Sequence, residues 1–211
     1  MKSLNFERAL VLGAHTDDEF GCSGTIQRLV ESGCEVFCAA FSRCEQSLPP
    51  GFAPDVLEHE MRDSVGSLGV PADHLIFYDY AVRHFPSRRQ EILEDMVKLR
   101  ARLNPDLVLL PAGSDIHQDH HVIFEEGLRA FKFGTVLGYE LPMNTITFHH
   151  ACFLEISANH LLKKVRSVGF YKSQQHRPYM TDEFIRSLAT VRGMQAGVAY
   201  AEAFEVIRFK L

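Results

Sequence analysis

The sequence predicts an α/β fold in which a mostly parallel, Rossmann-like sheet carries helices on both faces. Three observations predict it. Short apolar runs alternate with longer amphipathic segments along the chain, and strands that alternate with helices form parallel sheets because each crossover helix packs back onto the sheet. Glycine and proline separate the segments, and clusters of His and Asp directly follow two of the apolar runs.

The first part of the pattern predicts three strands and two helices. The strands are apolar runs that stop at glycine or at polar loop residues, and the helices have apolar residues spaced three to four positions apart. Ile26, Leu29 and Val30 share one side of a helix that Gly33 ends. In chain order we expect strand Ala9–Leu12, helix Ser23–Ser32, strand Glu35–Ser42, helix Asp55–Leu68 and strand His74–Tyr78.

The second part continues the alternation and then adds strands. We expect helix Arg88–Leu103, strand Leu107–Leu110, helix His121–Phe131, strands Val136–Leu141 and Cys152–Ile156, helices Ala158–Val168 and Asp182–Met194, and strand Phe204–Phe209. The strands at 136–141 and 152–156 are expected to be antiparallel at one edge of the sheet. Because no linker, repeat or low-complexity tract interrupts the chain, we interpret residues 1–211 as a single domain with one core.

Two clusters of ionisable residues follow predicted strands. The first, residues 15–19 (HTDDE), follows strand 9–12, and the second, residues 117–121 (HQDHH), comes shortly after strand 107–110. In the common strand order 3-2-1-4 these two strands are neighbours at the switch point where open α/β sheets bind ligands. The residues expected to meet there are His15, Asp17 and Asp18 from the first cluster and His117, Asp119 and His120 from the second.

Each cluster also has a purely structural interpretation. A single His in an acidic turn is usually a hydrogen-bonded loop residue, the acids at 17–19 can be helix-N-terminal carboxylates, and Asp119 can be a helix cap. Three adjacent carboxylates shielded from water repel one another, however, unless a cation or a proton offsets their charge. Because both clusters follow strands predicted to be neighbours, a metal site is the better interpretation.

The donor types narrow the choice of metal. Carboxylate oxygen and imidazole nitrogen suit zinc in a site with three protein ligands and one open position, and open zinc sites activate water for hydrolysis. His15-x-Asp17 with a later His is also the pattern of a facial triad that binds Fe(II) in oxygenases, although those enzymes usually have all-β folds. A non-catalytic phosphate or nucleotide module, using the helix N-terminus at Gly21-x-x-Gly24, is a third alternative.

Composition limits the partners. The formal net charge is -5, so the chain has no basic footprint for nucleic acid or an anionic membrane surface. No stretch approaches the roughly 18 apolar residues of a membrane span, and the N-terminus lacks the apolar region of a signal peptide. The 5 cysteines lack the paired spacing of structural zinc sites and are expected to be reduced. These features predict a cytoplasmic protein with a small-molecule partner and leave a homo-oligomer open.

The two clusters also carry a family resemblance. Residues 13–19 (GAHTDDE), followed by Gly-x-x-Gly-Thr, resemble the A-H-P-D-D-E motif of the PIG-L/LmbE-like zinc-dependent N-acetylglucosaminyl deacetylases. Residues 117–120 (HQDH) resemble their second motif, H-x-D-H. Residues 171–179 and parts of 192–205 are similar to the C-terminal part of that family. The resemblance therefore covers nearly the whole chain and implies a PIG-L/LmbE-like fold.

The resemblance implies a role for each residue of the first motif. It makes His15 and Asp18 zinc ligands, with His120 of the second motif as the third. Asp17 becomes the general base that activates the metal-bound water. The family removes an N-acetyl or related acyl group from glucosamine-type sugars, so the implied substrate is an acetamido sugar or sugar conjugate.

The second motif completes the implied chemistry. A protonated His117 is expected to stabilise the oxyanion and to protonate the departing amine, while Asp119 orients its partners through hydrogen bonds. A base and an acid that titrate at different pH predict a bell-shaped dependence of the rate on pH.

Two positions depart from the family pattern. Thr16 replaces the usual Pro, which removes no ligand. Leu57, three residues before Glu60, stands where many members carry an Arg that lines the substrate pocket, so the substituents of the sugar stay open. Side chains expected to contact a sugar from the loops after the second and third strands are Arg43, Gln46, Tyr78, Tyr80 and Arg83.

Overall fold

The structure, a computed structural model, describes residues 5–210 and is built around one seven-stranded sheet. Its strands are β1 (Arg8–Gly13), β2 (Glu35–Ala40), β3 (Leu75–Phe77), β4 (Leu107–Pro111), β5 (Thr135–Tyr139), β6 (Cys152–Glu155) and β7 (Ala201–Arg208). They are arranged in the order β3-β2-β1-β4-β5-β7-β6, and β1 to β5 are parallel to one another. The predicted mostly parallel sheet and the predicted order of its first four strands are confirmed.

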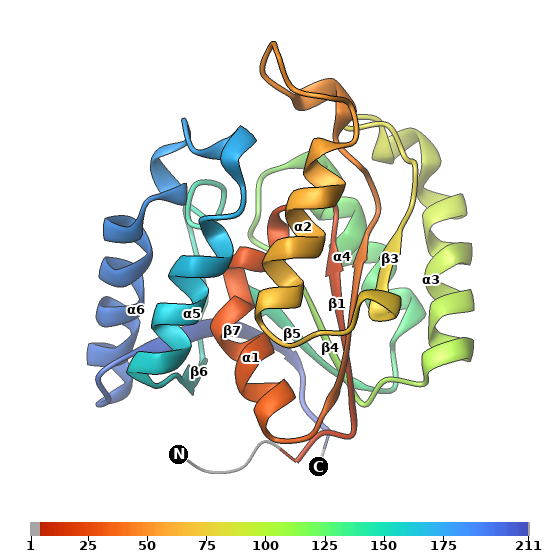
Figure 1. Ribbon diagram of the computed structural model, residues 1–211. Helices are drawn as coiled ribbons and strands as arrows, with labels where there is room; N and C mark the ends of the chain where they lie inside the picture. Colours follow the sequence, from red (N-terminus) through yellow and green to blue (C-terminus); the bar gives the residue numbers. More distant parts are fainter. Residues whose placement is uncertain (1–4, 211) are drawn as a thin grey trace.

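Helices cover both faces of the sheet, as Figure 1 shows. They are α1 (Ser23–Glu31), α2 (Val56–Ser67), α3 (Arg89–Leu103), α4 (Gln118–Ala130), α5 (Ala158–Val168) and α6 (Asp182–Ala196). The first two pack with α5 and α6 on one face, and α3 packs with α4 on the other. Along β1, Ala9 and Val11 belong to the first core while Leu10 and Leu12 belong to the second. A strand buried on both faces needs such an unbroken apolar run.

Two element boundaries differ most from the prediction. Helix α4 begins at Gln118 rather than His121, because the side chain of His117 accepts a hydrogen bond from the backbone N–H of Asp119 and caps the helix. Strand β7 begins at Ala201 rather than Phe204. None of the helices within residues 5–210 has the length and apolarity needed to cross a bilayer.

The edge of the sheet also differs. Strands β5 and β6 were expected to be antiparallel at one edge, but β5 is parallel to β4 and lies inside the sheet. Strand β7 runs antiparallel between β5 and β6. The residues of β7 from Ala201 to Phe204 are buried, whereas β6 is half-buried throughout. The more deeply buried strand therefore takes the interior position and the half-buried one forms the edge.

Candidate metal and active site

The loop after β1 makes a tight turn that places His15 beside Asp18. A Cβ atom on Gly13 would lie 2.9 Å from the carbonyl oxygen of His15, so this position requires glycine. The backbone N–H of His15 donates to Oδ2 of Asp18 at 2.9 Å. The Tyr171 hydroxyl also holds this loop, because it donates to the carbonyl oxygen of Thr16 at 2.8 Å. A proline would offer the same carbonyl, so Thr16 removes no contact from the loop.

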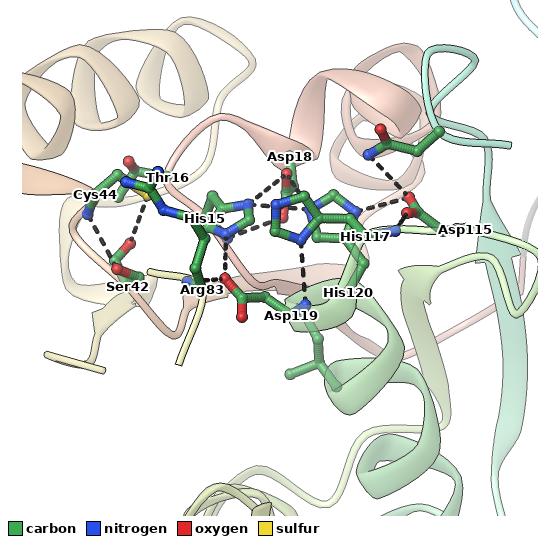
Figure 2. A network of polar contacts seen from close by, with 12 residues as sticks. His15, Thr16, Asp18, Ser42, Cys44, Arg83, Asp115, His117, Asp119 and His120 are labelled. Atoms are coloured by element: carbon green, nitrogen blue, oxygen red, sulfur yellow. Dashed lines mark hydrogen bonds and ion pairs between the residues drawn. The ribbon is translucent and has the colours of Figure 1, made fainter. Parts of the chain in front are cut away.

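The loop between β4 and α4 brings the second cluster to the same place (Figure 2). The backbone N–H of His117 donates to Oδ1 of Asp115 at 2.8 Å. The backbone N–H of Asp119 donates to Nδ1 of His117 at 3.2 Å. Because β1 and β4 are adjacent and parallel, their carboxyl ends meet. The two clusters therefore converge, as the strand order predicts.

Three donor atoms from the two loops face one another. His15 Nδ1 lies 3.0 Å from His120 Nε2. Asp18 Oδ1 lies 3.6 Å from the first of these nitrogens and 3.3 Å from the second. Donor atoms bound about 2.05 Å from a tetrahedral zinc ion are about 3.3 Å apart. Two imidazoles and a carboxylate at these separations therefore fit a zinc ion in both chemistry and spacing.

Each of the two imidazoles has a carboxylate on its other ring nitrogen. Asp115 Oδ2 lies 2.7 Å from His120 Nδ1, and Asp119 Oδ2 lies 3.1 Å from His15 Nε2. Carboxylates in this position fix the orientation and the tautomer of metal-binding histidines. Asp119 is fully buried and also accepts the backbone N–H groups of Arg83 at 2.6 Å and Phe85 at 3.3 Å. It therefore joins a third loop, between β3 and α3, to the site.

Asp115 is the residue of this site to which the sequence analysis gave no role. It belongs to the loop before the second motif, but no spacing rule indicates that its side chain reaches both His117 and His120. Arg83 is a different case. Its φ of 70° lets its backbone N–H reach Asp119, while its exposed side chain donates to the carbonyl oxygen of Gln46 at 3.3 Å.

The carboxylate of Asp18 controls the charge of both imidazoles. Burial acts to lower their pKa values, but attraction to Asp18 together with the hydrogen bonds to Asp119 and Asp115 outweighs it and raises the pKa of His15 to about 9 and that of His120 to about 10. The same attraction holds the pKa of Asp18 well below its usual range in spite of burial. Without a metal, protons therefore supply the positive charge that this group of donor atoms requires.

The three adjacent carboxyl groups avoid mutual repulsion in different ways. Asp18 remains an anion between the two imidazoles. Burial raises the pKa of Glu19 to about 8, and behind the site its Oε1 lies 2.5 Å from the Tyr171 hydroxyl oxygen and accepts a hydrogen bond from Ser64 at 3.1 Å. Burial and the charge of Asp18 raise the pKa of Asp17 as well. Asp17 faces the open cavity and is therefore a carboxylate of increased basicity.

His117 lies beside the other two imidazoles but differs from them in its hydrogen bonding. A ring nitrogen of each of the three lies within 4.8 Å of the others. Nδ1 of His117 accepts a backbone N–H, so the neutral ring carries its proton on Nε2 and has no lone pair there for a metal. Burial and the charges of His120 and His15 lower the pKa of His117 to about 4. The ring is therefore neutral near pH 7, which differs from the protonated state expected from the sequence.

A cavity of about 200 Å³ opens onto these groups, and its walls include Phe20, Leu57, Asn144, Gln174, Arg177 and Tyr179. The wall is partly apolar and partly hydrogen-bonding, as sites for small polar ligands are. Leu57, which stands where the resemblance led us to expect an Arg, borders this cavity.

The side chains expected to contact a sugar lie to one side of this cavity. Arg43, Gln46 and Tyr80 border a separate cavity of about 130 Å³, and neither cavity is lined by Tyr78 or Arg83. The loops after β2 and β3 therefore approach the site through other residues, among them Cys44 and Ser47. All 5 cysteines are free, as predicted, and burial raises the pKa of the Cys44 thiol to about 12.

Comparison with known proteins identifies the family. The family model of GlcNAc-PI de-N-acetylases, PIG-L, matches residues 10–131. The chain belongs to the PIG-L family. This confirms the resemblance seen in the two motifs. The family is one of deacetylases, amidohydrolases that act on N-acetyl amide bonds, and the chain is an enzyme of this class.

Individual relatives agree with this assignment. Over 169 residues the chain is 27% identical to the uncharacterized deacetylase YaiS of Escherichia coli K12, an alignment that covers 78% of this chain and 90% of YaiS. The structure is similar to N,N'-diacetylchitobiose deacetylase from Pyrococcus horikoshii, with a TM-score of 0.82, 20% identity, and coverage of 96% of this chain and 84% of that one.

The same fold also occurs in an enzyme with different chemistry. The 4-carboxy-2-hydroxymuconate hydratase GalB from Pseudomonas putida KT2440 matches with a TM-score of 0.78 and 21% identity, over 97% of this chain and 98% of GalB. Similar folds host different reactions, so the reaction class rests on the family match and on the residues of the site.

Proposed function

We propose that this protein is a zinc-dependent hydrolase that removes the N-acetyl group from a glucosamine-type sugar or sugar conjugate. The observation that carries the proposal is the convergence of His15 Nδ1, Asp18 Oδ1 and His120 Nε2, which lie 3.0 to 3.6 Å from one another. We assign these three residues as the metal ligands. We also take residues 1–211 as one catalytic domain, because its C-terminal strands extend the sheet that begins with β1.

Asp17 is the general base in this proposal. A zinc ion held by the three ligands would supply a Lewis acid that polarises the amide carbonyl and lowers the pKa of a water molecule towards about 7. The carboxylate of Asp17 takes a proton from the attacking water, and its raised pKa moves its basicity closer to neutral pH. Asp17 then returns this proton to the departing amine nitrogen, so the carboxylate is regenerated at the end of the cycle.

His117 acts on the oxygen of the scissile amide. Its Nε2–H donates a hydrogen bond to that oxygen as negative charge develops, and a fixed donor of this kind stabilises the transition state more than the ground state. Asp119 holds His117 through its backbone N–H and His15 through its carboxylate. The pKa of about 4 makes His117 a hydrogen-bond donor and leaves proton delivery to Asp17.

The two alternatives receive less support. An Fe(II) oxygenase would require chemistry outside the deacetylase family to which the chain belongs. A phosphate-binding module would require free N–H groups at the start of α1. Those of Gly24 and Thr25 already donate to the carboxylate of Glu202, at 2.9 and 2.7 Å.

Acetate release and metal content together test the proposed function. The metal content of the protein as isolated is measured, and the protein is then incubated with N-acetylglucosamine, diacetylchitobiose and N-acetylated amino acids at matched concentrations. We expect one zinc ion per chain and acetate mainly from the sugars. Faster turnover of the amino acids would contradict the sugar substrate but not the deacetylase reaction. Iron in place of zinc, or no bound metal, would contradict the metal assignment.

A further inference from the structure

One side chain in the wall of the catalytic cavity has no role in the proposed mechanism. Arg177 lies between two short 3-10 turns, where its backbone N–H donates to Gln174 and its carbonyl oxygen accepts from Met180, both at 3.0 Å. Its Nη1 donates to the Tyr179 hydroxyl, and its guanidinium carbon lies 5.7 Å from the centre of that ring. Backbone and side-chain contacts thus fix the guanidinium beside the cavity.

Within residues 5–210 Arg177 forms no ion pair, although its positive charge acts on Asp17 in the same cavity and tends to lower the pKa of that carboxyl group. Arg43, Arg89 and Arg192, by contrast, each form an ion pair with Asp or Glu. The Nε atom of Arg177 is buried and has no hydrogen-bond acceptor. A half-buried guanidinium with unused donors is unfavourable in the free protein, because the lost hydration is not replaced. Because the buried Nε has almost no accessible surface, a ligand oxygen would accept from the terminal Nη groups of this guanidinium, of which only Nη1 has a partner.

Arg177 differs in charge from the other ionisable side chains that line the cavity. Among the described residues, no other Arg and no Lys borders the cavity, which presents the carboxyl groups of Asp17 and Asp18 close to the reaction centre. These carboxyl groups repel an anionic ligand unless a local cation offsets them. Guanidinium is the side chain best suited to bind carboxylate or phosphate oxygens, through charge-assisted and often paired hydrogen bonds.

We propose that Arg177 binds an anionic group, a carboxylate or a phosphate, on the acetamido substrate. The natural substrate is then a negatively charged acetamido sugar rather than a neutral one. This inference rests on the proposed deacetylase function and narrows its substrate class. If Arg177 instead served only to balance the charge of Asp17, its removal would affect neutral and anionic substrates alike. The two roles therefore predict different results.

Binding measurements separate these roles without depending on turnover. Calorimetry is performed on the zinc-loaded His117→Ala protein, which keeps the charge of Asp17, binds substrate and hydrolyses it slowly. The neutral probe is N-acetylglucosamine, the phosphate probes are its 1-phosphate and 6-phosphate, and the carboxylate probe is N-acetylmuramic acid. We expect at least one charged probe to bind about 10-fold or more tightly than the neutral one, the usual scale for a charge-assisted hydrogen bond. The preferred probe distinguishes phosphate from carboxylate.

Variants of Arg177 in the same background assign the preference to this residue. Arg177→Gln should reduce the preference for the charged probe to within about 3-fold, and Arg177→Lys should restore part of it. Arg186→Gln, on the exposed side of α6, removes the same charge from the molecule and should keep the full preference. The inference is wrong if no charged probe binds more tightly than N-acetylglucosamine, or if Arg177→Gln weakens all probes equally.

Acetate release by the wild-type protein tells the two proposals apart. Release from neutral and charged compounds at equal rates would leave the deacetylase proposal intact and overturn only the role of Arg177. Release from none of them, together with tighter binding of a charged probe, would overturn the proposed reaction while leaving the anion site supported.

Discussion

Two buried groups of charged residues lie at opposite ends of the segment from His15 to Thr25. In one group the charges balance one another, and in the other positive charge is missing. One is the proposed metal site, with His15 and Asp18 from the loop after β1. The other lies at the start of α1, where Glu202 of β7 accepts hydrogen bonds from Lys164 at 2.6 Å and from the backbone of Gly24 and Thr25. Both Glu202 and Lys164 are about 5% exposed.

The pair of Glu202 and Lys164 balances its own charge. Both carboxylate oxygens have partners, and the positive end of the α1 dipole adds to the attraction. In the metal site, Asp18 and the carboxylates hydrogen-bonded to the two rings raise the pKa of His15 to about 9 and of His120 to about 10, so a proton compensates the negative charge until a cation replaces it. A buried group whose charges balance one another stabilises the packing of the helices and strands that it joins. A buried group that lacks positive charge is suited to bind a cation.

Removing a ligand should produce the largest difference between the two groups. His120→Ala deletes one of three proposed ligands, so zinc affinity should fall by more than the roughly 100-fold that loss of an outer-shell partner causes, and deacetylation should fall to background. Metal analysis after gel filtration, with an assay of acetate release, checks both effects. Full zinc content together with full activity would show that the ligand set is wrong.

Asp17→Asn should separate catalysis from metal binding at the same site. Because Asp17 is a base and not a ligand, kcat should fall by about 10²- to 10⁴-fold while one zinc ion per chain remains bound. Steady-state kinetics and metal analysis on one preparation test this. If zinc and activity were lost together, Asp17 would be a ligand and the base would lie elsewhere.

Lys164→Met should lower the stability of the protein without affecting metal binding or catalysis. It leaves the buried Glu202 without its counter-charge, so the free energy of unfolding should fall by about 3 to 5 kcal/mol, while zinc content and kcat of the folded protein stay unchanged. Chemical denaturation of the zinc-loaded protein measures this change. Lys163→Met is the matched control, since the more exposed Lys163 pairs with Glu31 at 3.4 Å and should change stability by less than about 1 kcal/mol. Similar losses of unfolding free energy in both variants would show that the pair of Glu202 and Lys164 is no more important to stability than an exposed ion pair.

Asp115→Asn should have the smallest effect of the four substitutions. The variant keeps the shape of the side chain but weakens its hold on His120 Nδ1, so zinc affinity should fall by about 10- to 100-fold with the fold retained. Competition with a chelator of known affinity gives the value, and Asp119→Asn should act similarly through His15. An unchanged affinity in both variants would remove these carboxylates from the description of the site.

The sequence is sufficient to predict the convergence of His15, Asp18 and His120, because the order of parallel strands decides which loops meet. It does not identify Asp115 or Arg177 as parts of the site, since their roles depend on side-chain orientation in loops and 3-10 turns that lack a periodic pattern. The position of β7 between β5 and β6 is missed for a related reason. A short apolar strand indicates that it is buried but does not specify its neighbours.

The charge of His117 required the structure as well. A histidine in an H-x-D-H motif fits either a protonated acid or a neutral donor, and the family resemblance implied the first. Burial next to two other imidazoles lowers its pKa to about 4, and the capping bond from Asp119 fixes which nitrogen carries the proton. Neither effect has a signature in the spacing of the motif.

The central claim is that the proposed metal site lacks positive charge until a cation displaces a proton. Zinc titration of the metal-free protein at pH 7, by calorimetry in two buffers of different ionisation enthalpy, tests this claim most directly. The pKa of His15 is raised to about 9 and that of His120 to about 10, but their facing nitrogens, 3.0 Å apart, can share only one proton, so the pair carries one extra proton at pH 7. We predict one zinc ion per chain, release of about one proton, and an affinity that rises with pH up to about pH 9. Absence of stoichiometric zinc binding, or binding without proton release, would contradict the account.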